Sequence, residues 1–535
     1  MHNPTMVAAT DKPCFVLELA LRVDSTGRKR LARDFDFARQ LVNATLGTAL
    51  GRRIQMRQTP EWKAACVMPK GKERTVAFQK VTQSIGISSA YDFEKILQAH
   101  AKASGRAKQV NANVKQTLAD NLWRSWSAWL FEGKGKPRFK GMSRGLHSIR
   151  GKDNKQGIIW KPEIQSVRYA GNLYRVHIPQ RDSYAHEAIR DGNGWRKAKY
   201  CAIVRKTIHG KLKYFVQITF EGNPPTKIIP ATTDLAVGID PSMTNMTLAF
   251  SDGVVEKVKT SPSVEDRTKE IRRLQRAMDR SKRASNPSNF NADGTAKKGA
   301  RTWVYSKSYQ RLRKAVADLQ RRRADARKNE HGQLINWILQ NAGEIRVEQN
   351  SWKAMQRGWF GKSVGDGAPS DFVARLLSKA DRAGSKAFKM NPRNIKPTQC
   401  DLLTGKFTKH ALWERRVRLG ETDLFIDRDA MAALNLLFHS PETELRDAEG
   451  LKHILETSKS HWLNAGVLVE VKAANRLSKR ELRHILRNGK KSITVERLHS
   501  KKFLNGVCDA ESKKVPHGSF CGSESLPHSE TPSLQ

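Results

Sequence analysis

The chain has 535 residues, and its 97 Lys and Arg against 52 Asp and Glu give a formal net charge of +45 at pH 7. This length allows several hydrophobic cores, and so strong a positive charge points to nucleic acid as the partner, with an affinity that falls as salt rises. The alternative is a ribosome-associated or merely soluble basic protein. The sequence shows neither an apolar run of the roughly 20 residues that cross a membrane nor a signal peptide, and its cysteines form no CxxC pair. We therefore expect a cytoplasmic protein without a membrane partner.

The first expected elements are a short strand and a long helical region. Residues 14–23 form an apolar run with the length and β-branched content of a strand, and residues 31–131 have mostly helical spacing. Within the helical region, Trp123, Trp126 and Trp129 stand three residues apart along one helix face. A tryptophan stripe at this spacing usually buries apolar area, so we expect it to pack in a core rather than to stack on bases.

Strand patterns return between residues 140 and 222, where two segments are typical of β-hairpins. Gly171-Asn172 and His209-Gly210 stand at the expected turns. The simplest topology is a β-domain that begins with residues 14–23, is interrupted by the helical region, and is completed by residues 140–222.

A Pro-rich linker at residues 222–234 precedes a strand pair, LAVGID and MTLAFSDG, and then a basic helical region from about 264 to 340, which NPSNFNADGTAKKG interrupts. Its basic side chains outnumber its acids beyond what i,i+4 pairing would use. This excess favours contacts with nucleic-acid phosphates over a solvated helical hairpin. The residues from His439 onward are basic and weakly patterned, and we expect the final tail to be disordered.

Three acidic residues stand in a fixed order at the ends of apolar segments. Asp240 ends the run AVGID, Glu348 ends the alternating segment EIRVE, and Asp429 begins a helical pattern in IDRDAMAALNLL. The alanines after Asp429 permit close packing, so this helix can approach a sheet. Carboxylates at such positions can face a cleft and ligate a divalent cation, although single acids in these places are more often caps or surface residues.

Asp427 competes with Asp429 for the same role. The first of two aspartates before a helix is often an N-cap, whose carboxylate accepts hydrogen bonds from backbone N–H groups, and Asp427 fits that description. Asp429 would then be the acid that faces the metal ions.

These motifs resemble a known nuclease family. The order GID, a long basic helical insertion, VE and then DRDxxAAxN resembles the RuvC-type, RNase H-like nuclease of TnpB proteins and compact type V CRISPR effectors. GKPRFKG at residues 135–141 looks like a segment of the TnpB β-domain, and NPRNIKPTQC at 391–400 looks like the stretch that enters its zinc ribbon. The resemblance covers residues 14–438.

The resemblance implies a multidomain α+β fold. It consists of a β-barrel wedge domain with an inserted helical recognition domain, followed by a split RNase H-like (RuvC) α/β domain with a helical insertion. The implied segments are 1–30 and 132–225 for the wedge domain, 31–131 for the recognition domain, 226–262, 330–390 and 424–440 for the RuvC domain, 263–329 for its basic insertion, 391–423 for a degenerate zinc-ribbon-like region, and 441–535 for a basic C-terminal extension.

The resemblance also implies an RNA-guided DNA endonuclease of the prokaryotic cytoplasm, associated with the nucleoid, whose partners are a guide RNA and double-stranded target DNA. The family's catalytic acids fall on Asp240, Glu348 and Asp429, which would hold two Mg²⁺ ions with Asp240 between them. The candidates for contacts with nucleic-acid backbones are Arg138, Lys140, Arg272, Arg273, Arg276, Arg311, Arg313, Arg321 and Arg322.

Two departures from the family pattern matter. The region of the zinc ribbon contains only Cys400, and one cysteine with His410 does not make a tetrahedral site, so we expect no zinc. Met431 stands where the family's DRDxNAA carries asparagine. The alternative is therefore an RNA-guided DNA binder that silences its target with weak or no cleavage. A third hypothesis, an unguided nucleic-acid-binding protein or transposition accessory, leaves the ordered acids unexplained.

Overall fold

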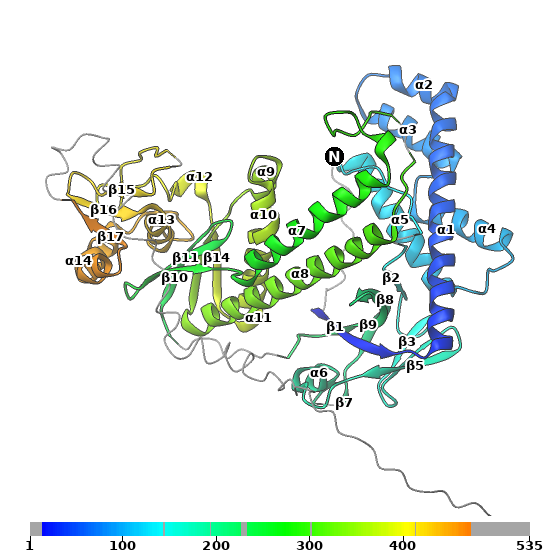
Figure 1. Ribbon diagram of the computed structural model, residues 1–535, viewed down its shortest axis with the longest axis horizontal. Helices are drawn as coiled ribbons and strands as arrows, with labels where there is room; N and C mark the ends of the chain where they lie inside the picture. Colours follow the sequence, from blue (N-terminus) through cyan, green and yellow to red (C-terminus); the bar gives the residue numbers. More distant parts are fainter. Residues whose placement is uncertain are drawn as a thin grey trace, which may run out of the picture. The chain divides into compact units, whose positions relative to one another are not determined.

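The computed structural model describes residues 13–142, 145–192, 194–225, 233–299, 302–411 and 413–471 (Figure 1). The chain divides into two compact units, unit 1 with residues 1–227 and 267–322 and unit 2 with residues 228–266 and 323–535. Both contain helices and β-sheets, which confirms the predicted α+β class. The later part of the expected C-terminal extension, residues 472–535 with the tail, lies outside the described residues. None of the described helices combines the length and apolar composition that crossing a membrane requires.

The main sheet of unit 1 has seven strands in the order β2-β8-β9-β1-β5-β4-β3. Its strands are β1 (Cys14–Arg22), β2 (Ser148–Arg150), β3 (Ile158–Lys161), β4 (Ser166–Tyr169), β5 (Asn172–His177), β8 (Ala198–Ile208) and β9 (Lys211–Glu221). The first strand lies between β9 and β5 and pairs antiparallel with both. One sheet therefore joins a strand from before the helical region to strands from after it. Because β3 also contacts β8, the sheet curves back on itself.

The β8–β9 and β4–β5 turns show how the residues of a turn determine which residues of the two strands are paired. The β8–β9 turn is His209-Gly210, as predicted, with φ of 50° and 73°. The β4–β5 turn is Ala170-Gly171, with φ of 47° and 75°, one residue earlier than predicted. A two-residue hairpin turn of this kind needs positive φ at both central residues, and Asn172 is instead paired in the ladder.

Five helices follow β1 in unit 1: α1 (Ser25–Gln58), α2 (Pro60–Val67), α3 (Lys72–Ile85), α4 (Ala90–Ala103) and α5 (Ala112–Phe131). Local caps fix several of their starts. Asp24 accepts from the backbone of Gly27 at the start of α1, and Ser89 and Asp92 form a capping box at the start of α4.

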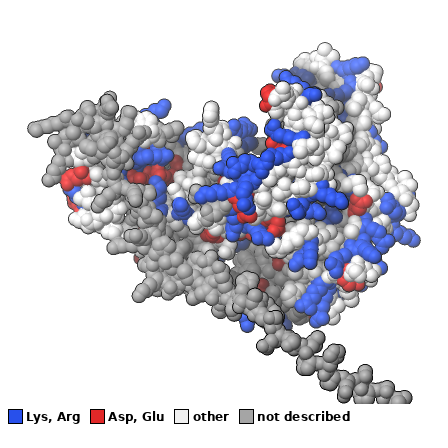
Figure 2. Space-filling view, viewed as in Figure 1, with Lys and Arg blue, Asp and Glu red and all other residues white. Residues whose placement is uncertain are grey.

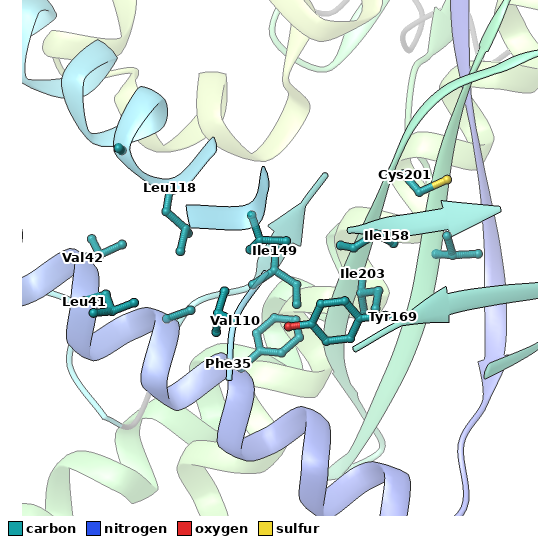
Figure 3. Close-up of a cluster of buried hydrophobic side chains, with 14 of the residues drawn as sticks. Phe35, Leu41, Val42, Val110, Leu118, Ile149, Ile158, Tyr169, Cys201 and Ile203 are labelled. Atoms are coloured by element: carbon teal, nitrogen blue, oxygen red, sulfur yellow. The ribbon is translucent and has the colours of Figure 1, made fainter. Parts of the chain in front are cut away.

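The tryptophan stripe of α5 packs in the core, as predicted. Trp126 is fully buried and contacts Trp129 edge to face, and Trp123 packs beside Phe93. This core is continuous with the side chains between α1 and the sheet, where Phe35 lies beside Tyr169 (Figure 3). Unit 1 therefore has one core that joins its helices to its sheet.

The main sheet of unit 2 has five strands in the order β12-β11-β10-β13-β14. They are β10 (Ala236–Pro241), β11 (Asn245–Phe250), β12 (Val255–Lys259), β13 (Glu344–Glu348) and β14 (Lys386–Met390). The first three form an antiparallel meander, whereas β10, β13 and β14 run parallel. Helices cover both faces of this sheet, which explains why β10 and β11 are buried along almost their whole length.

The two faces use different helices. Val237 and Ile239 pack against α8 (Lys307–Asn341) and α11 (Pro369–Ala383), whereas Ala249 packs against α13 (Arg428–Leu437) on the opposite face. The basic region predicted as helical forms α7 (Ser263–Ala284) and α8, and the predicted break between them contains the short 3-10 helix η1 (Pro287–Asn289). Both α7 and α8 contribute residues to the two units.

Residues assigned to the C-terminal extension form part of the unit 2 core. A small sheet, β15-β16-β17, consists of β15 (Arg416–Arg418), β16 (Leu424–Asp427) and β17 (Leu468–Glu470), and α14 (Ala448–Asn464) precedes β17. Trp462 of α14 is fully buried, and its indole N–H donates to the Gly253 carbonyl at 2.6 Å. Residues 448–470 thus belong to the folded core of unit 2. The spacing of Leu451, Leu455 and Trp462 along one helix face was the overlooked signal.

The remaining elements are short. They are α6 (Ser183–Ala188), β6 (Arg190–Asp191), β7 (Gly194–Trp195), α9 (Trp352–Arg357), α10 (Gly361–Gly367) and α12 (Pro392–Ile395).

Candidate carboxylate site

Asp240 and Glu348 lie at the carboxyl ends of two neighbouring parallel strands. The register of β10 and β13 pairs Ile239 with Val347, so the next pair in the same register is Asp240 and Glu348. Side chains at paired positions point to the same face of a sheet. Both are buried, with exposed fractions of 7% and 8%. Folding therefore brings together two acids that are more than a hundred residues apart.

Gly238 explains how a helix approaches these acids. A Cβ at this position would overlap the backbone of α13 at the Ala433 carbonyl and at Leu437. Gly238 lies on the same face of β10 as Asp240, two residues earlier. The alanines of α13 permit the close packing, but the contact depends equally on this glycine.

The direction of α13 then places Asp429 toward Asp240. Arg346, the register partner of Gly238, donates to the carbonyls of Leu437 and His439 at the end of the helix, the latter at 3.1 Å. The helix start therefore points toward the acids. Two strand residues advance about 6.6 Å and four helix residues about 6 Å, so Asp429, one turn before Ala433, comes level with Asp240.

Asp427 caps α13, which agrees with the alternative weighed for it. Its carboxylate accepts from the backbone N–H of Asp429 at 2.9 Å and of Ala430 at 3.2 Å. Because the cap occupies Asp427, Asp429 is the acid of this pair that is left to face the sheet.

Lys257 is a fourth member of the site, and its sequence neighbourhood did not indicate this. Asp240 pairs with Thr247 on β11, and Thr247 pairs with Lys257 on β12, so these side chains form a row across one face of the sheet. The Lys257 ammonium forms an ion pair with Asp429 and lies 3.8 Å from Asp427. We call Asp240, Glu348, Asp429 and Lys257 the carboxylate site.

The electrostatics of the site reflect crowded, buried carboxyl groups, and those of Asp240 and Glu348 are hydrogen-bonded to each other. Burial raises the pKa of the Asp240 carboxyl well above its ordinary value of 3.8, and the charges of Glu348 and Asp429 raise it further. Burial also raises the pKa of Glu348, against the hydrogen bond that its carboxylate accepts from Asn350. Placing a cation beside these groups would relieve the repulsion.

Lys257 supplies part of that compensation. Burial by itself lowers the pKa of its ammonium, but the attraction of Asp427 and Asp429 outweighs burial, and the pKa is raised overall. Lys257 is therefore charged and acts as a resident cation on the Asp429 side of the site.

The carboxylate oxygens of the site are ligands that suit a hard divalent cation. They are not gathered around one common point in this structure. Among the described residues, no three His, Cys, Asp or Glu side chains are close enough together to hold a metal ion. The Asp429 carboxylate is instead paired with the Lys257 ammonium. Carboxylate oxygens are the ligands that Mg²⁺ prefers, and the ammonium already occupies a cation position.

Met431 belongs to the hydrophobic core and not to the carboxylate site. Its side chain is fully buried in the apolar cluster that contains Leu434 and Trp462. Asn435, one helical turn later, donates to the carbonyls of Pro397 at 3.0 Å and Cys400 at 2.7 Å. This amide fixes the loop that enters the predicted ribbon region, a role the sequence analysis did not foresee.

Cys400 and His410, the two possible zinc ligands of the predicted ribbon region, have different surroundings. The Cys400 thiol is buried, which raises its pKa, and its nearest polar neighbours are backbone carbonyls. His410 lies 3.4 Å from Glu414, with which it forms an ion pair when protonated.

Most of the basic residues that the sequence singled out on α7 and α8 are exposed. Figure 2 shows Lys and Arg gathered along α7. The exposed candidates on these helices are Arg272, Arg273, Arg276, Arg311, Arg313 and Arg322. Arg321 is half-buried.

Arg321 and Arg322 have a partner within unit 1. Both bond to the Asp318 carboxylate at 2.9 Å, and Arg322 also contacts the His209 ring in the β8–β9 turn. The hydrogen bond from Arg321 lowers the pKa of Asp318 to about 2. Arg322 and Asp318, which accepts from the His209 N–H at 3.2 Å, therefore join α8 to the hairpin.

The segment GKPRFKG is held through its backbone. The Lys140 N–H donates to Asn43 of α1 at 2.7 Å, and its carbonyl accepts from the same side chain at 3.0 Å. The side chains of Arg138, Phe139 and Lys140 remain exposed.

Comparisons with known proteins give structural likeness only. No protein-family model matches the chain, and no curated protein matches it. The chain is similar to a cryo-EM structure of the Cas12f1-sgRNA-target DNA complex, with 13% sequence identity and a TM-score of 0.42 over 81% of this chain and 99% of that chain. It is also similar to a cryo-EM structure of the CRISPR-Cas12f ternary complex, with 13% identity and a TM-score of 0.27 over 78% of this chain and 85% of that chain.

Proposed function

We propose that this protein is an RNA-guided DNA-binding protein with a Mg²⁺-dependent endonuclease site formed by Asp240, Glu348 and Asp429. The observation that carries the proposal is the juxtaposition of Asp240 and Glu348 in one register, with α13 presenting Asp429 toward them. Buried carboxylates that repel one another are unfavourable in a structural role. They are useful where a cation must be held.

Each residue has a distinct part in this proposal. Asp240 is the most buried of the acids and interacts with both of the others, so it would be the central ligand of the cations. Asn350 orients the Glu348 carboxylate, and Asp427 fixes the start of the helix that carries Asp429. Mg²⁺, when bound, supplies the positive charge that polarises a phosphodiester and acidifies a water molecule.

The proposed partners are a guide RNA and double-stranded target DNA. The net charge of +45 and the exposed arginines of α7 and α8 favour a polyanion. Sequence selection would come from base pairing with the guide, so the protein needs only contacts with the nucleic-acid backbone and shape.

A second candidate is an RNA-guided DNA binder that silences its target with weak or no cleavage. Two observations favour it. Lys257 is bonded to Asp429, so a divalent cation must compete with an ammonium for this ligand. Met431 is buried in the core, where it offers no polar group to the site.

The deciding experiment uses the full chain purified with the RNA that accompanies it. Sequencing this RNA defines a matching DNA target, and nicking is measured with and without Mg²⁺ for the wild type and for Asp240→Ala. The control is Asp381→Ala, which removes an exposed acid of α11. Nicking by the wild type and the control but not by Asp240→Ala supports the endonuclease. RNA-dependent binding without nicking supports the silencing candidate, and absence of RNA-dependent binding refutes both.

A further inference from the structure

Residues 351–367, which we call the aromatic segment, begin and end beside the carboxylate site. The segment begins next to Asn350, whose amide donates to Glu348. At its other end, Gly367 lies so close to the Met243 carbonyl, in the turn that follows Asp240, that a Cβ would overlap it. Both ends of the segment are therefore anchored beside the two strand acids.

The base of the aromatic segment is held firmly by α8. Arg327 donates to the carbonyls of Gly365 at 3.0 Å and Asp366 at 2.8 Å, and Arg323 forms an ion pair with the Asp366 carboxylate at 2.9 Å. A segment fixed in this way can present its tip in a defined position.

The tip of the aromatic segment exposes large apolar side chains. Trp359 is fully exposed, with a relative accessibility of 101%, and Phe360 and Met355 are exposed at 49% and 40%. Figure 2 shows uncharged atoms protruding at the position of α9. Gly361 packs against the Gln356 carbonyl where a Cβ would not fit, which fixes the turn that carries both aromatic rings. Exposed aromatic pairs of this kind usually mark an interaction site.

The charges around these rings indicate what they contact. Between Ser351 and Gly365 the sequence contains three basic residues, Lys353, Arg357 and Lys362, and no acidic residue. All three are exposed. Aromatic rings interleaved with basic side chains are the arrangement by which proteins bind single-stranded nucleic acid, with bases on the rings and phosphates on the cations.

We propose that Trp359 and Phe360 form a stacking platform for an unpaired base of the nucleic-acid strand that enters the carboxylate site. Lys353, Arg357 and Lys362 neutralise the phosphates of the same strand. The platform positions the nucleic-acid strand. A base stacked on the tip of the segment fixes the strand's own backbone, which then runs toward the carboxylate site at the ends of the segment. This inference rests on the proposed function, since it assigns the substrate strand of the same site.

The test measures binding without cleavage. Full-length protein in EDTA is titrated with a short single-stranded DNA that carries 2-aminopurine, whose emission falls when the base stacks on a ring. Trp359→Ala is expected to weaken binding about tenfold, which corresponds to about 1.4 kcal/mol, and to restore the emission of the bound probe. Trp359→Phe keeps a ring and should regain most of the affinity.

Leu445→Ala provides the matched control, because Leu445 is another exposed apolar residue of unit 2, at 71%, and its removal should change neither signal. Equal affinity and equal quenching for the wild type and Trp359→Ala overturn the platform. A change of oligomeric state in Trp359→Ala, seen by sedimentation, also overturns it, because the tip would then be a protein interface. If the wild type binds target DNA with its RNA but no single strand, only the platform fails. If it binds no nucleic acid at all, the proposed function fails with it.

Discussion

Replacing Lys257 by methionine tests whether its ammonium occupies a cation position. Methionine keeps the aliphatic length but removes the charge that is bonded to Asp429. The acids of the site would then be left without their resident cation. We expect the region around α13 to become less stable in EDTA and more responsive to Mg²⁺ than in the wild type.

The burial of the ion pair sets the magnitude. Removing one partner of a fully buried pair costs about 3–5 kcal/mol. The Lys257 side chain is 27% exposed and that of Asp429 is 15% exposed, so solvent reduces the cost, and we expect about 2 kcal/mol. Mg²⁺ at about a hundred times its dissociation constant contributes about 2.7 kcal/mol, enough to offset this loss.

Hydrogen–deuterium exchange of peptides from β12 and α13 gives the assay, because it reports local opening and does not require the two units to unfold together. Lys259→Met, which removes an exposed lysine from the same strand, is the control. Unchanged protection in Lys257→Met without metal, together with a wild-type response to Mg²⁺, would refute the idea that the ammonium takes a cation's place.

Three further predictions follow from the same contacts. Gly238→Ala should push α13 from β10 and cost about 1–3 kcal/mol of local stability by hydrogen exchange, whereas Gly365→Ala, which has open space around it, should cost none; equal effects would contradict the packing. Burial, with the nearby Arg327 and Arg375, lowers the pKa of His331 from 6.5 to about 4, so the unfolded state binds a proton that the folded state does not. Stability of unit 2 should therefore fall by up to about 3 kcal/mol as pH drops from 6.5 to 4, and His331→Gln should remove that part of the slope in denaturant titrations at several pH values. Arg273→Gln with Arg276→Gln should weaken nucleic-acid binding and lower the slope of log affinity against log salt by about 2, and an unchanged slope would exclude both from phosphate contact.

The sequence predicted the parts of this molecule that local pattern determines. The strands ending at Asp240 and Glu348, the Asp427 cap and the His209-Gly210 turn all follow from alternation or from the chemistry of one or two residues. The strand pattern of residues 14–23 predicted β1 itself, whereas its place between β9 and β5 is seen only in the fold.

The residues that sequence reasoning missed depend on contacts between distant segments. Lys257 joins the site only because β10, β11 and β12 share a register, and nothing in its own neighbourhood indicates that. Gly238 matters because α13 crosses it. Arg321 and Arg322 bond to Asp318, and Arg322 contacts the β8–β9 turn, which the basic composition of α8 does not indicate. In each case the partner is set by tertiary structure, which one-dimensional spacing does not encode.

The most direct test of the central claim is whether the three acids act as one cation site. Mn²⁺ binding to the full chain, followed by paramagnetic resonance, is measured for Asp240→Asn, Glu348→Gln, Asp429→Asn and the pairwise combinations. If the acids share bound ions, each single substitution weakens the same binding event, and the pairs lose less affinity than the sum of the singles. Two results would mean that Asp240, Glu348 and Asp429 do not hold a common cation. One is Mn²⁺ binding that persists in each of the three single variants, and the other is losses of binding free energy that simply add in the pairs.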